Sequence, residues 1–209
     1  FNCLSNTKAQ SANFPFCTIE PNHSIINVPD KRLITLQEIV NPEKLIPATV
    51  EIVDIAGLVK GASKGEGLGN KFLANIRETD AIIHVLRCFD NDNITHVDGS
   101  VDPIRDKEII DIELQLKDLE SLNNRLEKVS RTVKSGDKEA AREKEVLNQA
   151  ILFIESSNNI RSIDLDEDDI NKYLKPLQLI TSKPVLYVCN VDEGSVTSIN
   201  SYVESVKSL

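Results

Sequence analysis

Methionine and tryptophan are absent from this 209-residue sequence, and aromatic residues make up only 4% of it. A core built from this sequence must therefore rely on aliphatic side chains, and an apolar content of 40% is sufficient for one. Methionine is missing even at position 1, so we expect the chain to be a piece of a longer protein. The length suits one large domain or two small ones.

Several other features are also missing. The four cysteines are scattered and form no C-x-x-C pair, which argues for reduced thiols and against a disulfide framework or a zinc site. The three isolated histidines form no metal cluster, and we expect His84, among apolar neighbours, to be buried and hydrogen-bonded. Without a membrane-spanning apolar run or a signal peptide, the sequence predicts a cytoplasmic protein with no membrane contact.

The net charge of −9 argues against direct DNA binding, because neutralising phosphates requires clustered Lys and Arg side chains. A local basic patch is still compatible with this overall charge.

Four runs rich in β-branched residues predict strands, and amphipathic segments between them predict helices. The strands are expected at Ser24–Val28, Val50–Ile55, Ala81–Phe89 and Pro184–Asn190, and two of the helices at Lys31–Val40 and Asn70–Glu78. The last three strands are nearly continuous in apolar residues, which is typical of strands covered on both faces. The alternation of strands and helices predicts an α/β fold.

A charged helical region follows Asp102. Its apolar residues recur at a spacing of seven, at Ile112, Leu119, Leu126 and Val133, with Ile109, Leu116, Leu122 and Val129 on the same stripe. Beyond the turn at residues 135–137 the spacing returns, at Ala140, Leu147 and Ile154, with Ala150 and Ile151 beside them. This pattern predicts an antiparallel coiled-coil hairpin. We expect residues 103–183 to be a helical coiled-coil insertion in the α/β domain formed by residues 1–102 and 184–209.

The most informative motif begins where the strand near residue 50 ends. Asp54 closes that strand, Gly57 follows three residues later, and five of the eight glycines lie between residues 57 and 69. An Asp at a strand end can hold Mg²⁺ through water, and a Gly N–H can approach a terminal phosphate because no Cβ intervenes. D-x-x-G alone is a weak pattern, and an ordinary loop with a helix-capping Asp is the alternative. Its position before a Gly-rich loop favours a nucleotide switch.

Two further segments fit such a switch. Thr18, in a polar loop before the first strand, can offer its hydroxyl to Mg²⁺ and its N–H to a γ-phosphate, although this segment taken alone favours a simple strand-entry loop. The last strand ends in Asn190, at an edge where open α/β sheets bind ligands. Guanine-binding switches carry N-K-x-D there, whereas this chain has Val191 for the Lys and Glu193 for the Asp. A strand end with an Asn-containing turn is the alternative.

Together these motifs are similar to those of the YchF/Obg-like ATPase family of P-loop NTPases, and the resemblance covers essentially the whole chain. Residues 13–22 resemble its switch I, residues 54–81 its switch II with the next helix and strand, and residues 190–193 its altered base-recognition motif. The family's phosphate loop would end just before Phe1, and its TGS domain would follow Leu209. The resemblance therefore implies an incomplete P-loop NTPase (Ras-like G domain) sheet, and a piece that is inactive by itself.

For the intact protein, the resemblance implies a Mg²⁺-dependent nucleoside triphosphatase that prefers ATP and acts on ribosomes. The residues expected at its site are Thr18 and Asp54 for Mg²⁺, Gly57 for the γ-phosphate, and Asn190, Val191 and Glu193 for the base.

Leu58 occupies the position where Ras-like switches carry a water-orienting Gln, so the catalytic group is unknown. Hydrolysis is expected to be slow, or to use an ion or a partner residue. Two alternatives stay open. One is a GTPase, and the other is a nucleotide-independent module that docks ribosomal or protein partners through the coiled coil.

Overall fold

The computed structural model describes residues 4, 22–55, 68–91, 93–94, 96, 99–134, 136–198 and 200–209, with the backbone alone at residues 68–71. The chain divides into two compact units, Phe1–Gly57 and Leu58–Leu209. The described strands form two sheets of two strands each.

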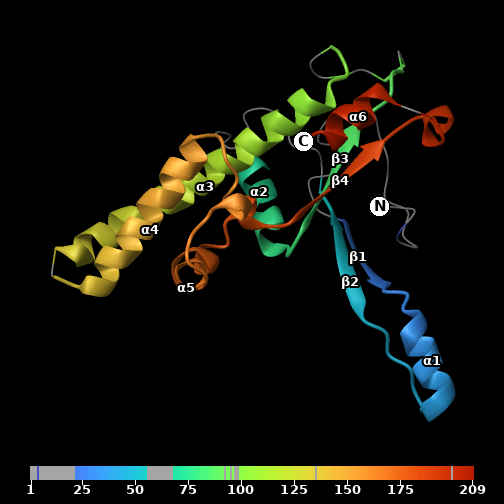
Figure 1. Cartoon of the computed structure of the whole chain (residues 1–209), viewed down its shortest axis with the longest axis horizontal. Coiled ribbons are helices and arrows are strands. Elements are labelled where there is room, and N and C mark those ends of the chain that lie inside the picture. Colours follow the sequence, from blue (N-terminus) through green and yellow to red (C-terminus); the bar gives the residue numbers. More distant parts are fainter. Residues whose placement is uncertain are drawn as a thin grey trace. The chain divides into compact units, whose positions relative to one another are not determined.

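The first unit contains an antiparallel strand pair with a helix in its connection (Figure 1). Its elements are β1 (Asn22–Asn27), α1 (Lys31–Val40) and β2 (Thr49–Asp54). The Asp30 side chain starts α1 by accepting a hydrogen bond from the Arg32 N–H at 2.9 Å, as an N-cap does. The helix ends at Asn41, whose φ of 47° lies in the left-handed region typical of C-terminal caps. Both predicted ends of this helix are confirmed.

The second unit contains the other sheet and the longest helices. Its helices and strands are α2 (Leu68–Glu78), β3 (Ile82–Arg87), α3 (Pro103–Val133), α4 (Lys138–Glu155), α5 (Glu167–Asp169), β4 (Val185–Asn190) and α6 (Ser201–Lys207). β3 and β4 are parallel, with a register that runs from Ile82 opposite Val185 to Arg87 opposite Asn190. The long helical connection that parallel strands require is supplied here by α3, α4 and the turns that follow them.

α3 and α4 pack against each other as a helical hairpin (Figure 1). Gly136, with φ of 82°, lies in the connecting turn, and the Asp137 side chain caps α4. The two helices share one buried apolar cluster. Its members in α3 and α4 are Leu122, Val129, Ala140, Val146, Leu147, Ala150, Ile151 and Ile154. Much of the predicted apolar stripe is therefore buried, while the coiled-coil geometry itself stays a prediction.

The predicted stripe is wrong in the first half of α3. Ile112 and Leu116 are 51% and 37% exposed, whereas Leu114 and Asp118 are buried. The reason is that this half of α3 packs against β3 and against the turn Ile180–Ser182, so a different face of the helix is covered.

Burial alternates along β3 and β4, so the prediction that these strands are covered on both faces is also wrong. One face packs toward α3 and contains the buried residues Leu86 and Cys88. The exposed side chains of the opposite face are Ile83, Val85, Leu186 and Val188. In β2, Val50 is likewise exposed. Across the described parts of the chain, no helix combines the length and the apolar character needed to span a membrane.

Candidate functional site

The carboxyl ends of β3 and β4 meet at one edge of their sheet, where open α/β folds bind ligands. β3 ends at Arg87 and β4 ends at Asn190. Pairing extends one step further, because the Cys88 N–H donates to the Asn190 carbonyl oxygen at 2.7 Å. The main chain of Asn190 is thereby fixed, while its side chain is exposed and makes no hydrogen bond to a described residue.

The three residues expected around a base lie within this edge and the turn that follows it. Val191 is half-buried, and Glu193 is exposed at the start of a single turn, Glu193–Val196. Between them, the Asp192 carboxylate accepts hydrogen bonds from the Ser195 N–H at 2.9 Å and the Ser195 hydroxyl at 2.8 Å. These bonds hold the pKa of Asp192 below its ordinary value and commit its carboxylate to the turn. Glu193 is left as the carboxylate that faces solvent beside Asn190.

Two residues that the sequence interpretation missed attach α6 to this edge. The Asn200 side chain donates to the Cys88 carbonyl oxygen at 2.9 Å and caps α6 by accepting from the N–H groups of Tyr202 and Val203. The Tyr202 hydroxyl donates to the Asp90 carboxylate at 3.0 Å, and this bond raises the pKa of Tyr202. An Asn before a short helical segment is a capping signal that the sequence does contain. That signal does not indicate that the Asn200 side chain also bonds Cys88, which lies 112 residues away.

Arg87 is occupied by the loop that follows β3. Its guanidinium donates to the carbonyl oxygens of Phe89, Asn91 and Ile94 at 3.0 to 3.2 Å, and it lies over the Phe89 ring at 4.9 Å. These bonds use donors that a phosphate would otherwise engage. Arg87 therefore shapes the edge of the site and is not a free anion-binding group.

Cys88, which follows β3 at this edge, is removed from solvent. Cys88 is fully buried, and burial together with the neighbouring Cys189 raises the pKa of its thiol to about 12. Both are free thiols, as expected from the sequence. The thiolate is the reactive form of a cysteine, and burial of Cys88 disfavours it.

The residues expected to hold Mg²⁺ and phosphate belong to other segments. Asp54 is the half-buried last residue of β2, opposite Asn22 in the register. Thr18, Gly57 and Leu58 lie outside the described residues. A carboxylate at a strand end is a hard oxygen donor of the kind that Mg²⁺ prefers. Within the described residues, no group of three or more His, Cys, Asp or Glu side chains is arranged to hold a metal ion.

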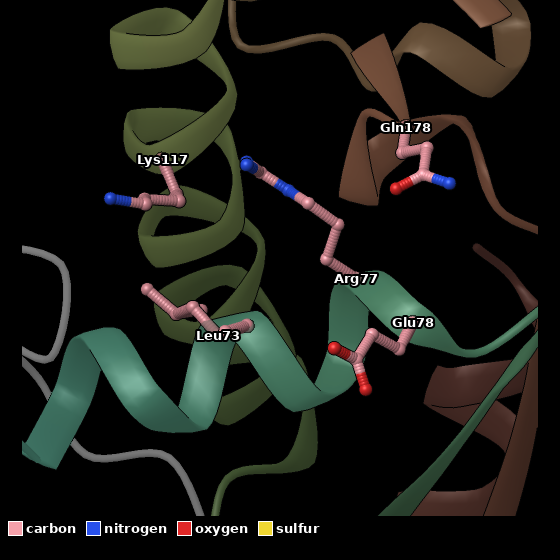
Figure 2. A pocket seen from close by; sticks show the side chains of 6 residues that line it. Leu73, Arg77, Glu78, Lys117 and Gln178 are labelled. Carbon is pink, nitrogen blue, oxygen red and sulfur yellow. The ribbon is translucent and has the colours of Figure 1, made fainter. Parts of the chain in front are cut away.

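A depression of about 340 Å³ lies between α2, α3 and the segment before β4 (Figure 2). Leu73, Ala74, Arg77, Glu78, Lys117 and Gln178 line it. Arg77 extends from α2 toward α3 and donates to the Ser121 hydroxyl at 2.8 Å, and Lys117 pairs with Glu120 at 2.6 Å. Both cations are thus engaged by the protein. We interpret the depression as the junction of α2 with α3 and not as a ligand pocket.

His84 lies on the covered face of β3, with its ring centroid 5.7 Å from that of Tyr187. It is half-buried and makes no hydrogen bond to a described residue, so the expectation of a hydrogen-bonded histidine is wrong. Burial lowers the pKa of His84, and Lys107 lowers it further, while the carboxylates of Asp111 and Asp106 oppose the shift. Lys107 and Asp111 are themselves paired at 2.9 Å.

This shift predicts a pH dependence of stability. The pKa of His84 in the folded protein lies below its ordinary value of 6.5, so the unfolded state binds the proton more readily. Its contribution to stability is complete above pH 6.5 and is lost as the pH falls through the folded-state pKa. We expect the stability advantage of the wild type over His84→Gln to shrink as the pH is lowered from 7 to 5. Urea unfolding at several pH values measures this, and an advantage that grows toward acid pH would contradict the assignment.

With this geometry established, comparisons with known proteins place the chain. The sequence profile of the family described as 50S ribosome-binding GTPase matches residues 1–124. A solved structure of the Schizosaccharomyces pombe YchF GTPase superposes on 94% of this chain with a TM-score of 0.75 and 38% identity. That match covers 54% of the solved chain. The chain therefore belongs to the 50S ribosome-binding GTPase family and has its α/β fold.

Among curated proteins, the similarity to the YchF branch spans the whole chain. The ribosome-binding ATPase YchF of Haemophilus ducreyi is 51% identical over all 209 residues, which make up 57% of its own length. The Bacillus subtilis protein of the same name is 53% identical over 196 residues, 94% of this chain and 53% of the relative. The chain thus spans a little over half the length of the curated relatives that it matches.

Proposed function

We propose that the whole protein is a cytoplasmic, Mg²⁺-dependent nucleoside triphosphatase that hydrolyses ATP and works as a nucleotide-controlled switch on the ribosome. The observation that carries the proposal is the carboxyl edge of β3 and β4, where β4 ends at the exposed Asn190 and the chain continues into Val191 and Glu193. Related proteins named ribosome-binding ATPase support the substrate and the partner.

The three residues suit adenine better than guanine. Guanine recognition in Ras-like switches needs an Asp carboxylate held against the ring N–H and amino group. Glu193 is one methylene longer and begins a turn of its own, while Val191 lacks the Lys stem that packs along the base. The main chain of Asn190 is fixed by its bond to Cys88, and backbone groups near Asn190 and Val191 are proposed to read the adenine edge instead.

For the metal, Asp54 and Thr18 are the proposed oxygen donors, with Asp54 acting through water and Thr18 directly. When bound, Mg²⁺ supplies charge neutralisation for the phosphates. Gly57 is proposed to approach the γ-phosphate through its N–H. Leu58 carries no polar group, so it can help only by packing, and the group that orients the attacking water is not assigned.

Two other functions have some support. A GTPase is favoured by the name of the yeast relative and by the name of the family. A nucleotide-independent docking module is favoured by the size of the α3–α4 hairpin, which is large relative to the nucleotide-binding elements. The proposed switch differs from the module in a simple way, because its ribosome binding depends on the nucleotide that it carries.

The test is calorimetric titration of the whole protein with Mg·ATP and Mg·GTP. We expect ATP to bind at least as tightly as GTP. A double variant, Val191→Lys with Glu193→Asp, restores the guanine-reading pattern and is expected to shift preference toward GTP, whereas Glu193→Gln alone is the matched control without that gain. Preference of the wild type for GTP by about tenfold, or about 1.4 kcal/mol, would show that the protein is a GTPase.

A further inference from the structure

We infer that the turn end of the α3–α4 hairpin binds the phosphate backbone of structured RNA. The surface concerned, here called the hairpin tip, comprises the described residues 125–134 and 136–138. This inference rests on the proposed function for the identity of the RNA, which would be ribosomal, and on the hairpin itself for the binding chemistry.

Charge is distributed unevenly along the hairpin. The tip contains five cationic and two anionic side chains, a net charge of +3 within a chain of net charge −9. Residues 103–120, the first part of α3, contain three cationic and six anionic side chains, a net charge of −3. The sign therefore reverses along one helix. A cationic end on an acidic protein directs polyanions to that end and away from the rest of the surface.

Three of the cationic side chains at the tip are available to a ligand. Arg125 pairs with Glu143, and Arg131 pairs with Glu127. Lys128, Lys134 and Lys138 are exposed and form no ion pair with a described side chain. In α4 just beyond the tip, Arg142 and Glu139 are held by Asp169 and Lys172 of the segment that braces the hairpin. The free positive charge is thus concentrated on these three lysines.

The composition of the tip specifies the kind of ligand. No Phe, Tyr or Trp occurs between Phe89 and Phe153 and no His occurs in the tip, so the tip has no ring on which unpaired bases could stack. Lysines on flexible stems contact phosphates as point charges and carry little sequence information. A surface of this kind suits the backbone of a helical RNA, which is recognised by shape and phosphate contacts.

The position of the tip suits such contact. The turn lies at the end of the hairpin away from β3 and β4 (Figure 1). The Asp137 side chain caps α4 by accepting from the N–H groups of Glu139 and Ala140, so its carboxylate is held against the start of that helix. From Lys128 to Lys134 the helix rises about 9 Å, which allows more than one phosphate to be contacted.

The test replaces Lys128, Lys134 and Lys138 together with Glu in the whole protein. The matched control replaces Lys31, Lys44 and Lys175, which are exposed outside the tip, with Glu as well. The two variants therefore have the same change in net charge. Binding to a fluorescent, short RNA duplex is measured by anisotropy over a range of KCl concentrations. We expect the tip variant to bind at least tenfold more weakly and to lose about three units from the slope of log affinity against log salt, because three counterion-releasing contacts are removed. The control is expected to retain most of both.

A second variant, with the same three lysines replaced by Gln, tests the result against a folding defect. It should show a smaller loss in the same direction, while circular dichroism shows an unchanged helix content. Equal behaviour of the tip and control variants would overturn the inference. So would unchanged RNA binding by a tip variant that no longer sediments with ribosomal subunits, because that result would assign the tip to a protein partner. Failure of the whole protein to bind ATP would overturn the proposed function and leave the RNA result standing.

Discussion

Replacing Asp118 with alanine is expected to lower the free energy of unfolding by about 3 to 5 kcal/mol. Asp118 is fully buried on α3, and its carboxylate accepts the N–H of Ile180 at 2.8 Å and the N–H and hydroxyl of Thr181 at 2.7 Å each. These bonds fix the turn that leads into β4. Burial raises the pKa of Asp118, while the three bonds and the charge of Arg77 oppose the shift. Alanine would leave the donors without an acceptor away from water.

Asp118→Asn gives a sharper result than alanine alone. An amide has one oxygen where the carboxylate has two, so its NH₂ group would face a backbone N–H that also needs an acceptor. We expect this isosteric change to cost about 2 kcal/mol or more. Asp164→Ala, at an exposed acidic position, serves as the control and should change stability by less than about 0.5 kcal/mol. Urea unfolding measures all three, and a cost for Asp118→Asn as small as the control's would show that the network is unimportant.

Asp54→Asn is expected to reduce steady-state phosphate release by the whole protein by roughly 100-fold. An amide at the end of β2 has the shape of the carboxylate but lacks the charge that would hold a Mg²⁺ ion and its water. Because Asp54 is only half-buried at a strand end, the change should leave the fold intact. Phosphate release is measured at saturating Mg·ATP, and unfolding is measured in parallel.

Leu58→Ala is the comparison for this variant. If the side chain at that position is outside the chemistry, turnover should stay within about threefold of the wild type, since only packing is altered. Loss of turnover in Leu58→Ala with normal turnover in Asp54→Asn would reverse the roles proposed on either side of Gly57.

Periodicity was sufficient to predict the four strands and the helices α1 and α2. The four strands and both early helices lie within two residues of their predicted bounds, because each is marked by β-branched runs or by an apolar stripe of helical spacing. The same reasoning predicted that Asn190, Val191 and Glu193 lie at the end of the last strand, because a polar residue after an apolar run marks a strand end. Local patterns of this kind depend on neighbours in the chain, which the sequence supplies.

The contacts that stabilise the site are not local, and the sequence does not reveal them. Asp118 lies in a charged helical stretch where a solvated face is the ordinary interpretation, yet it bonds a turn 63 residues away. Asn200 signals a cap but not its bond to Cys88. The heptad spacing likewise failed at Ile112, because a seven-residue repeat does not specify whether a helix faces another helix or a strand.

The junction of α2 with α3 has a mechanical consequence. Arg77 contacts Ser121 near the middle of α3, and Lys183 donates to the carbonyl oxygens of Arg77 and Thr79, so the end of α2 is held on two sides. From Ser121 to Val133 the helix rises about 18 Å, so a rotation of about 10° about that contact displaces the turn by about 3 Å. A small rotation of α3 about its contact with α2 therefore produces a larger displacement at the turn of the hairpin. An angular change small enough to keep the contact between α2 and α3 packed thus displaces the α3–α4 turn by about the length of a hydrogen bond.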